Sequence, residues 1–283
     1  MTSASGLPKF TVVIATYNAD KTLDACLDSV RSQTYLNHEV IVADGLSKDG
    51  TLAILRRRES EIAWVISEKD KGIYDAWNKI IPRATGDWLI FLGADDELWD
   101  ANVFAEAALL LANASENIIY GKVGIALPDK SILNFEGVEW NFVSSKFQHE
   151  MTLPHQGVFH RRTLFEKNGL FNPAFRICGD YEFLLRDLKD HPARFLPNLV
   201  VSRMAMGGVS STYRNVPTII RELSLARKLN GYHGISFYIL MRWARYYLRA
   251  FIRIVFGERA SHVVADLFRR ITGKPALWTR PKT

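Results

Sequence analysis

The chain contains the segment Trp88-Leu-Ile-Phe-Leu-Gly-Ala-Asp95-Asp96-Glu97-Leu98. Its uncharged beginning predicts a strand buried on both faces, and in an open α/β sheet the carboxyl end of such a strand faces the ligand crevice. Two adjacent acids there favour a hard divalent cation, because burying two like charges is unfavourable without one. The alternative is a polar turn in which Asp96 or Asp100 caps the next helix. For an isolated Asp-Asp pair the turn is favoured, so the rest of the chain must decide.

Strands and helices alternate before and around this segment. Apolar runs predict strands over 10–15, 39–43 and 62–67, and helical spacing of apolar residues follows each of them. The helix over 73–84 contains Pro82, which bends or ends it. This order predicts an α/β fold with a parallel, helix-covered sheet. Beyond Asp100 the pattern becomes mixed. A hairpin is expected over 118–135, strands near 158–160 and 197–202, and helices after Arg161 and over 183–188.

The length of 283 residues predicts one domain of about 210 to 230 residues with an appendage. We expect a disordered tail at 1–8, a domain at 9–215 and a helical segment at 216–283. Cys26 and Cys178 have no metal or redox spacing, so they are expected in the core of a protein from a reducing compartment. The first residues do not form a signal peptide pattern, and no charge-free run is long enough for a spanning helix.

The net charge of +6 is concentrated at the end of the chain: residues 232–283 carry +8 and residues 1–231 carry −2. Residues 237–256 are apolar except for four arginines, which fall within about 80° of one another on a helix of 100° per residue. A basic amphipathic helix of this kind is typical of an anionic membrane surface, and 260–271 forms a second one. The alternative is a helix docked on the domain with its arginines in water. The long apolar face argues against a nucleic-acid partner.

Polar loops follow the first four predicted strands, at 16–18, 44–51, 68–72 and 93–97. In a parallel sheet these loops converge on one crevice, and a nucleotide site is a natural use for it. The two commonest phosphate-binding loops, G-x-G-x-x-G after the first strand and G-x-x-x-x-G-K-[ST], are absent from the chain. Phosphate charge is therefore expected to be neutralised by a metal at Asp95 rather than by backbone amides.

Five segments in this order resemble the successive motifs of glycosyltransferase family 2. They are Val12-Val-Ile-Ala-Thr-Tyr-Asn18, Val42-Ala-Asp44-Gly-Leu-Ser-Lys-Asp-Gly-Thr51, Gly72-Ile-Tyr-Asp-Ala-Trp-Asn78, Thr85-Gly-Asp-Trp-Leu-Ile-Phe-Leu-Gly-Ala-Asp-Asp96 and Gly179-Asp-Tyr-Glu182. The resemblance covers about residues 9 to 215. It implies an inverting enzyme of the Rossmann-like GT-A fold, with a mostly parallel sheet, helices on both faces and a nucleotide-sugar donor. Residues 9–100 would form the nucleotide-binding half and 101–215 the acceptor half.

The resemblance assigns the nucleotide-binding residues. Thr16 and Tyr17 would lie beside the base and ribose, and Asp44 would accept a hydrogen bond from a uracil-like N–H, which favours a UDP-sugar. Asp70 and Lys71 would belong to a loop that closes over the base. The alternatives are a polar strand end for the first pair, a turn-forming aspartate at 44 and a solvated charged loop at 70 and 71.

The resemblance also assigns the reacting groups. Asp95 matches the last acid of the family's D-x-D motif and would bind Mg²⁺ or Mn²⁺, while Gly93 replaces the first acid, so that Asp96 or water would complete the metal site. Asp180 matches the catalytic base, which takes the proton of the acceptor hydroxyl. Its alternative role is the N-cap of the following helix.

His155 and Gln156 would lie near the donor diphosphate or the acceptor, although a lone histidine is more often structural. Together these expectations describe a peripheral enzyme on the cytoplasmic face of the inner membrane, acting on a lipid-linked glycan in surface polysaccharide or glycolipid assembly. One alternative is a sugar nucleotidyltransferase, which should carry a Gly-rich, basic first loop that this chain lacks. The other is a non-catalytic module that binds nucleotide or membrane.

Overall fold

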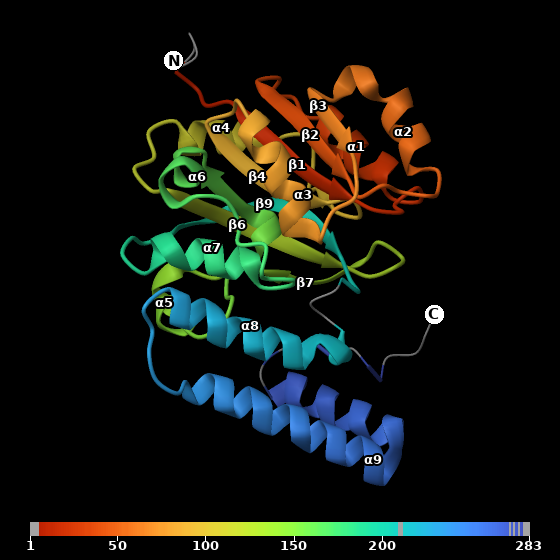
Figure 1. Cartoon of the computed structure of the whole chain (residues 1–283), viewed down its shortest axis with the longest axis vertical. Coiled ribbons are helices and arrows are strands. Elements are labelled where there is room, and N and C mark those ends of the chain that lie inside the picture. Colours follow the sequence, from red (N-terminus) through yellow and green to blue (C-terminus); the bar gives the residue numbers. More distant parts are fainter. Residues whose placement is uncertain (1–5, 209–211, 272, 274, 277, 280–283) are drawn as a thin grey trace.

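A single mixed sheet organises the molecule (Figure 1). The computed structural model describes residues 6–208, 212–271, 273, 275, 276, 278 and 279. The described residues form a nine-stranded sheet, whose order is β3 (Trp64–Ser67), β2 (His38–Asp44), β1 (Phe10–Thr16), β4 (Trp88–Gly93), β8 (Val158–Arg161), β6 (Ile118–Ala126), β9 (Arg194–Ala205) and β5 (Glu97–Leu98). The ninth strand, β7 (Ile132–Glu136), pairs with β6. The strands β3, β2, β1 and β4 are parallel, and β8 joins β4 in antiparallel orientation. The mostly parallel α/β sheet predicted for the amino-terminal half is therefore confirmed.

The amino-terminal half alternates strands and helices as its sequence pattern predicts. Its elements are β1 Phe10–Thr16, α1 Leu23–Arg31, β2 His38–Asp44, α2 Thr51–Arg57, β3 Trp64–Ser67, α3 Ile73–Ile80 and β4 Trp88–Gly93. The helix expected over 73–84 is shorter, because a 3₁₀ turn that contains Pro82 replaces its last residues at Ile81–Arg83. Proline cannot donate the backbone hydrogen bond that an α-helix would need there.

The carboxyl-terminal half is mixed, also as expected. Its elements are β5 Glu97–Leu98, α4 Val103–Leu111, β6 Ile118–Ala126, β7 Ile132–Glu136, α5 Trp140–Phe147, β8 Val158–Arg161, α6 Thr163–Asn168, α7 Gly179–Leu188, β9 Arg194–Ala205, α8 Val216–Leu229 and α9 Phe237–Ile271. Asn102, rather than Asp96 or Asp100, occupies the N-cap position of α4. The capping alternative for the Asp-Asp pair is therefore wrong, because the Asp96 carboxylate binds other backbone amides.

Helices cover both faces of the sheet, because alternate residues of its strands feed two hydrophobic clusters. Val13 and Phe91 pack with residues of α3, α7 and α8, whereas Ile14 and Ile90 pack with residues of α1 and α4. Continuous apolar strands are required for this arrangement, since both of their faces are buried. Cys26 and Cys178 are buried free cysteines within these clusters, as predicted.

The helical segment after 215 has two parts. Helix α8 shares the core with α7 and contributes Ile219 and Leu223 to it. Helix α9 is a helical hairpin that lies on the outside of α8 and turns at Gly257, where φ is 83° (Figure 1). Of the tail expected at 1–8, residues 1–5 lie outside the described residues. Among the described residues, no helix combines the length and the apolar character needed to cross a bilayer.

The arginines of α9 and its apolar side chains lie on different sides of the helix. Arg242 pairs with Glu150 at 2.7 Å between Nη1 and Oε2, and Arg245 lies over the ring of Phe268 in the second half of the hairpin. The apolar side chains point outward and are largely exposed, with Phe251 at 58 % and Ile254 at 83 %. The helix is thus docked, as the alternative expected, with Arg242 and Arg249 half-buried and Arg245 and Arg253 exposed, while much of its apolar face is also exposed.

Candidate active site

The predicted convergence of the strand ends is seen directly in the sheet register. Thr16 is level with Asp44, and Asp44 is level with Ser67, at the carboxyl ends of β1, β2 and β3. Ala15 is level with Gly93 at the end of β4. Four loops therefore leave one edge of the parallel sheet side by side, which is where ligands bind in open α/β sheets.

Asp44 is held by its neighbours at this edge and is only 2 % exposed. Its Oδ1 accepts a hydrogen bond from Ser47 Oγ at 2.5 Å, and its Oδ2 accepts from Ser47 N at 3.0 Å and from Ser67 Oγ at 2.6 Å. A carboxylate offers about four acceptor positions. One position therefore remains for a ligand, and the serines fix the direction in which it points.

Tyr17 and Asp70 approach each other around Gly45. A Cβ atom at Gly45 would lie 2.5 Å from Asp70 Oδ2 and 3.2 Å from Tyr17 Cδ2, so a side chain there would displace both residues. Asp70 Oδ1 also accepts a hydrogen bond from Gly72 N at 2.9 Å. The structure thus brings these two predicted residues beside Asp44. Lys71 follows on the same loop with an exposed side chain, and Thr16 Oγ1 is buried without a hydrogen-bond partner among the described residues.

The two acids after β4 have different surroundings. Asp95 is exposed, whereas Asp96 is 3 % exposed and accepts hydrogen bonds from Gly93 N at 3.0 Å and Ala205 N at 3.1 Å. Burial, and then the charge of Asp95, raise the pKa of Asp96 to about 7, against hydrogen bonds that include one from the Gln156 side chain. Asp96 therefore fastens the end of β4 to the end of β9, and Asp95 is the carboxylate open to a ligand.

The position of the missing first acid is filled by these carboxylates. A Cβ atom at Gly93 would lie 2.7 Å from Asp95 Oδ1 and 2.9 Å from Asp96 Oδ2. Within the described part of the chain, no group of three His, Cys, Asp or Glu side chains is arranged to hold a metal. One exposed carboxylate beside a substrate diphosphate is a common way to bind Mg²⁺, so Asp95 fits a metal that shares its ligands with the donor.

Asp180 lies in the first turn of α7, half-buried. Its Oδ1 accepts hydrogen bonds from Tyr74 Oη at 3.0 Å and from Tyr181 N at 2.9 Å. Burial raises the pKa of this carboxyl, although both hydrogen bonds oppose the shift. The two bonds share one oxygen, which leaves Oδ2 for another partner and is compatible with a base that is also tied to its helix.

Tyr74 connects α3 to the start of α7. The single hydroxyl proton of Tyr74 is shared between Asp180 Oδ1 and the carbonyl oxygen of Ile177, which is 2.6 Å away, and the tyrosine ring packs directly on Gly179. A Cβ atom at Gly179 would lie 2.8 Å from the tyrosine ring, so glycine is required for this close approach. The Gly-Asp dipeptide of the last motif therefore sets Asp180 against the third motif.

Glu222 of α8 fixes the segment that precedes α7. Its carboxylate accepts hydrogen bonds from three consecutive backbone amides, those of Arg176 at 2.8 Å, Ile177 at 2.9 Å and Cys178 at 2.8 Å. Three amides aimed at one carboxylate define the path of the chain closely. Helix α8 is thus part of the support for Asp180.

His155 lies in the core, in a 3₁₀ turn before β8, and is 8 % exposed. Its ring centroid is 5.6 Å from that of Trp77 and 5.5 Å from that of Phe91. Burial lowers the pKa of His155 to about 3, so the ring is neutral. This surrounding favours the structural role over contact with a donor or acceptor. Gln156, in contrast, reaches Asp96.

Tyr74, Ser67 and Glu222 were not selected from the sequence. Tyr74 lies inside the Gly72–Asn78 motif, which was a usable signal, and Ser67 ends a predicted strand level with Asp44. Glu222 carried no local signal. It is 42 residues beyond Asp180, and only the packing of α8 on α7 brings the two segments together.

Known proteins place this fold and site in one enzyme class. The model of "Glycosyl transferase family 2" matches residues 11–129, which include Thr16, Asp44, Asp70 and Asp95. The PGL/p-HBAD biosynthesis glycosyltransferase of Mycobacterium bovis is 31 % identical over 256 residues, covering 87 % of this chain and 94 % of its own. The UDP-Glc:alpha-D-GlcNAc-diphosphoundecaprenol beta-1,3-glucosyltransferase WfgD of Escherichia coli is 28 % identical over 208 residues, covering 72 % and 76 %.

Solved structures support the fold. Residues 1–349 of S. aureus TarS with UDP-GlcNAc match with a TM-score of 0.63 at 17 % identity, covering 93 % of this chain and 77 % of that one. The mannosyltransferase PcManGT of Pyrobaculum calidifontis, in complex with GDP-Man and Mn²⁺, matches with a TM-score of 0.61 at 20 % identity, covering 94 % and 81 %. The molecule is thus a glycosyltransferase with the GT-A fold. The chain belongs to glycosyltransferase family 2.

Proposed function

We propose that this protein is an inverting transferase that moves a sugar from a UDP-sugar to a hydroxyl of a lipid-linked glycan acceptor, in surface polysaccharide or glycolipid assembly. The names of two relatives support the acceptor class, since one concerns a mycobacterial glycolipid pathway and the other a diphosphoundecaprenol acceptor. The name of the second relative and the TarS complexes support uridine.

The observation that carries the proposal is that Asp180 combines a raised pKa with a carboxylate oxygen that has no hydrogen-bond partner among the described residues. A general base must be ionised, must have a free oxygen and must have a pKa not far below the working pH. Burial raises the pKa of Asp180, and its two hydrogen bonds both use Oδ1. In the proposed reaction, Oδ2 takes the proton of the acceptor hydroxyl as its oxygen attacks the anomeric carbon. The bond from that carbon to the diphosphate breaks on the opposite side, so the configuration inverts.

The donor side of the proposal uses the edge formed by β1, β2 and β3. Asp44, with three of its acceptor positions filled by serines, would use the fourth for a base N–H. Thr16 and Tyr17 would flank the base and ribose, and Asp70 and Lys71 would close over them. Tyr17 and Asp70 already meet at Gly45, which supports one shared site.

A divalent ion, Mg²⁺ or Mn²⁺, would be held by Asp95, and Asp96 would act behind it by fixing the loop. Bound there, the ion would neutralise the charge that develops on the leaving diphosphate. His155 would contribute to donor or acceptor binding only indirectly, because its neighbour Gln156 lies beside Asp96.

We also propose that the protein is peripheral, on the cytoplasmic face of the inner membrane. Exposed aromatic and aliphatic side chains line the outer side of α9, and exposed arginines such as Arg259 and Arg270 accompany them. This combination suits an interfacial helix at an anionic lipid surface. Truncation after Gly231, which removes α9, should move the protein from the membrane fraction to the soluble fraction.

The test is direct. A thermal-shift screen of nucleoside diphosphates and their sugars, with and without Mn²⁺, identifies the donor, and radiolabelled transfer to membrane lipid extracts then measures activity. The Asp180→Asn variant should lose transfer and keep donor binding. Retained turnover would remove Asp180 from the base role, and full transfer after EDTA treatment would remove the metal.

A further inference from the structure

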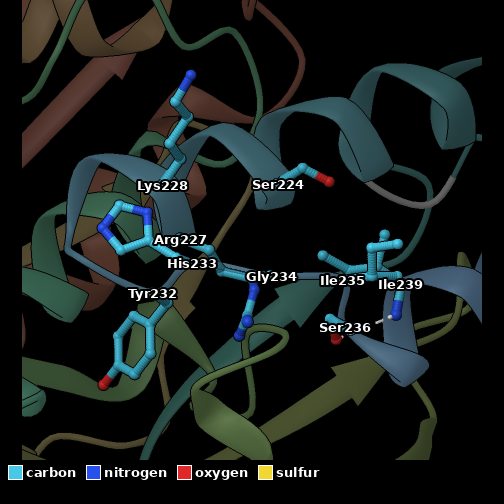
Figure 2. A pocket seen from close by; sticks show the side chains of 9 residues that line it. All are labelled: Ser224, Arg227, Lys228, Tyr232, His233, Gly234, Ile235, Ser236 and Ile239. Carbon is cyan, nitrogen blue, oxygen red and sulfur yellow. Dashed lines mark hydrogen bonds between the residues drawn. The ribbon is translucent and has the colours of Figure 1, made fainter.

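One cavity of about 430 Å³ lies between the end of α8 and the start of α9, lined by residues that include Arg227, Tyr232 and Ser236 (Figure 2). A second cavity, of about 300 Å³, lies where the chain after β9 meets the hairpin of α9. Its lining combines two arginines and a histidine with two aromatic rings and one carboxylate, that of Glu258. The residues that matter are Gly207, Tyr213, Arg249, Arg253, His262 and Trp278. The cavity is at the small end of the range for ligand pockets and is open to solvent.

The positive charge of this cavity is poorly compensated. Among the described residues, Arg249 has no carboxylate within 4.0 Å, and its Nε donates a hydrogen bond to Ser261 Oγ at 3.3 Å. Arg253 has one carboxylate neighbour, Glu258, at the distance limit of 4.0 Å. The nearby Asp266 carboxylate attracts Arg249 without a close ion pair and accepts hydrogen bonds from the backbone of Trp278 and Thr279, so it compensates part of the positive charge. Two adjacent guanidinium groups with so little opposing charge favour an anion.

The aromatic rings hold these arginines in place. The Arg249 guanidinium carbon lies 5.0 Å from the ring centroid of Tyr213 and 5.1 Å from that of Trp278, and the Arg253 carbon lies 6.0 Å from that of Tyr213. His262 stacks on Trp278 with centroids 5.5 Å apart. Burial lowers the pKa of Arg249, though an arginine stays charged at any ordinary pH. A fixed guanidinium with free N–H groups is the side chain best suited to a phosphate.

The cavity lies between the crevice and the proposed membrane face. Ala205 N donates to Asp96, and Gly207, two residues later, lines the cavity. On the far side, α9 presents Phe251 and Ile254 outward, while the half-buried Arg249 and the more exposed Arg253 both lie against the ring of Tyr213. A helix with side chains is about 10–12 Å across, and an interfacial helix sinks about 5–10 Å into the boundary between headgroups and acyl chains. The inner side of α9 would then lie level with lipid phosphates.

We propose that this cavity binds the phosphate or diphosphate group that joins a lipid to its polar head, and that it holds the acceptor between the membrane and the crevice. The placement of the acceptor rests on the proposed function. The binding of a lipid phosphate does not. The rest of the acceptor would extend past Gly207 toward Asp95 and Asp96.

The experiment measures binding by isothermal titration calorimetry with the full-length protein. Farnesyl diphosphate is the probe, farnesol is the same chain without phosphate, and dihexanoyl phosphatidic acid is a phospholipid headgroup probe. Each titration is run with the donor site saturated with UDP, so that diphosphate binding in the crevice does not contribute. The wild-type protein should bind farnesyl diphosphate and not farnesol. Tighter binding of farnesyl diphosphate would identify the lipid-linked acceptor as the ligand. Tighter binding of phosphatidic acid would identify a phospholipid.

The Arg249→Gln, Arg253→Gln variant should weaken farnesyl diphosphate binding by at least about tenfold, because it removes charge-assisted hydrogen bonds. The matched control is Arg31→Gln, Arg56→Gln, which removes the same charge from exposed positions of α1 and α2 on the catalytic body and should keep the affinity. The affinity for UDP, measured separately, should be unchanged in both. If the first variant is poorly folded, Arg249→Lys, Arg253→Lys keeps the charge and should bind with intermediate affinity.

Equal affinity in the Arg249→Gln, Arg253→Gln variant and the control would overturn the proposal, as would equal binding of farnesol. A wild-type protein that binds farnesyl diphosphate through these arginines, but transfers no sugar from any donor, would refute the proposed function and leave the phosphate site standing.

Discussion

The two proposed reacting groups, Asp180 and Asp95, are each positioned by a neighbouring residue. Asp180 is oriented by Tyr74, which is 106 residues away, and Asp95 is oriented by Asp96 and by the absence of a side chain at Gly93. Each of these acids has a partner that is buried while the acid itself stays accessible. Each acid therefore acts together with a buried neighbour, Tyr74 for Asp180 and Asp96 for Asp95. That neighbour can be substituted without removing the acid.

We expect Tyr74→Phe to shift the pH profile of transfer. The hydrogen bond from Tyr74 lowers the pKa of Asp180, so its loss raises a pKa that burial has already raised. A base works only when ionised, so activity is lost as the pH falls through this pKa. The acid limb of kcat/KM should therefore move to higher pH. Tyr35→Phe, which removes a hydrogen bond to the Pro8 carbonyl, is the control. An unmoved acid limb would contradict the assignment.

Adding a methyl group at Gly93 tests whether Asp95 binds the metal. In Gly93→Ala, the new Cβ would lie within 3.0 Å of carboxylate oxygens of both Asp95 and Asp96. Asp95 can turn away because it is exposed, so we expect weaker activation by Mn²⁺ in a titration of the transfer reaction. Overpacking also costs about 1–3 kcal/mol in the free energy of unfolding. In the control Gly208→Ala the Cβ meets open space. Unchanged Mn²⁺ dependence in Gly93→Ala would exclude Asp95 as the ligand.

At the scale of elements, the two halves of the crevice form in different ways. Parallel strands bring their carboxyl ends to one edge, and this brings Thr16, Asp44 and Gly93 together. The second half of the site depends on helix packing: α7 carries Asp180, and α8 holds the chain before α7 through Glu222. A substitution in α8 should therefore affect the position of Asp180, the proposed base, without a direct contact to it.

We expect Glu222→Ala to lower the free energy of unfolding by on the order of 3 kcal/mol, because one buried and two partly buried amides lose their acceptor. Turnover should fall as well, since the chain before Asp180 is no longer fixed. Urea unfolding and transfer rates measure the two effects. Glu222→Gln keeps an acceptor oxygen and should be intermediate. In the control, Glu166→Ala removes an exposed ion pair with Arg162 and should cost less than about 1 kcal/mol. Equal stability of Glu222→Ala and wild type would refute the supporting role of α8.

The sequence predicted the parallel strands and their polar ends because both are local features. Uncharged runs identify buried strands, and sheet geometry then brings Asp44 and Asp95 to one edge. The burial of His155 could not be predicted in this way, because its aromatic neighbours come from α3 and β4. The same holds for Tyr74 and Asp180, whose contact is made only when α3 and α7 pack.

At the scale of the whole molecule, α9 is arranged unlike an ordinary surface helix. The sequence pattern separated its arginines from its apolar residues, but a pattern of this kind does not say which side faces the body. In the structure the arginines contact Glu150, Phe268 and Tyr213, and the apolar side chains are exposed. An exposed apolar surface of this extent is typical of an interaction site.

Full-length variants with charges on this surface test the membrane role. We expect Phe251→Glu, Ile254→Glu to weaken binding to vesicles of phosphatidylglycerol and phosphatidylcholine by at least about tenfold, because each buried apolar side chain contributes about 1.5–3 kcal/mol. The matched control is Leu36→Glu, Leu109→Glu, which changes two exposed leucines on the catalytic body. Cosedimentation measures both. Equal loss in the two variants would indicate a charge effect, and no loss in the first would contradict a membrane-facing α9.

The burial pattern of α9 has a consequence for local unfolding. Only Ser261 and Asp266 are buried in this helix, whereas eight residues of α7 are. Segments with few buried contacts open at low free energy, independently of the core. In water, the amide hydrogens of α9 should therefore exchange with deuterium far sooner than those of β1 or α7. If lipid covers the outer face, as proposed, hydrogen exchange of the same amides should slow down. Helix α9 would then become ordered at the bilayer while the catalytic body is unchanged.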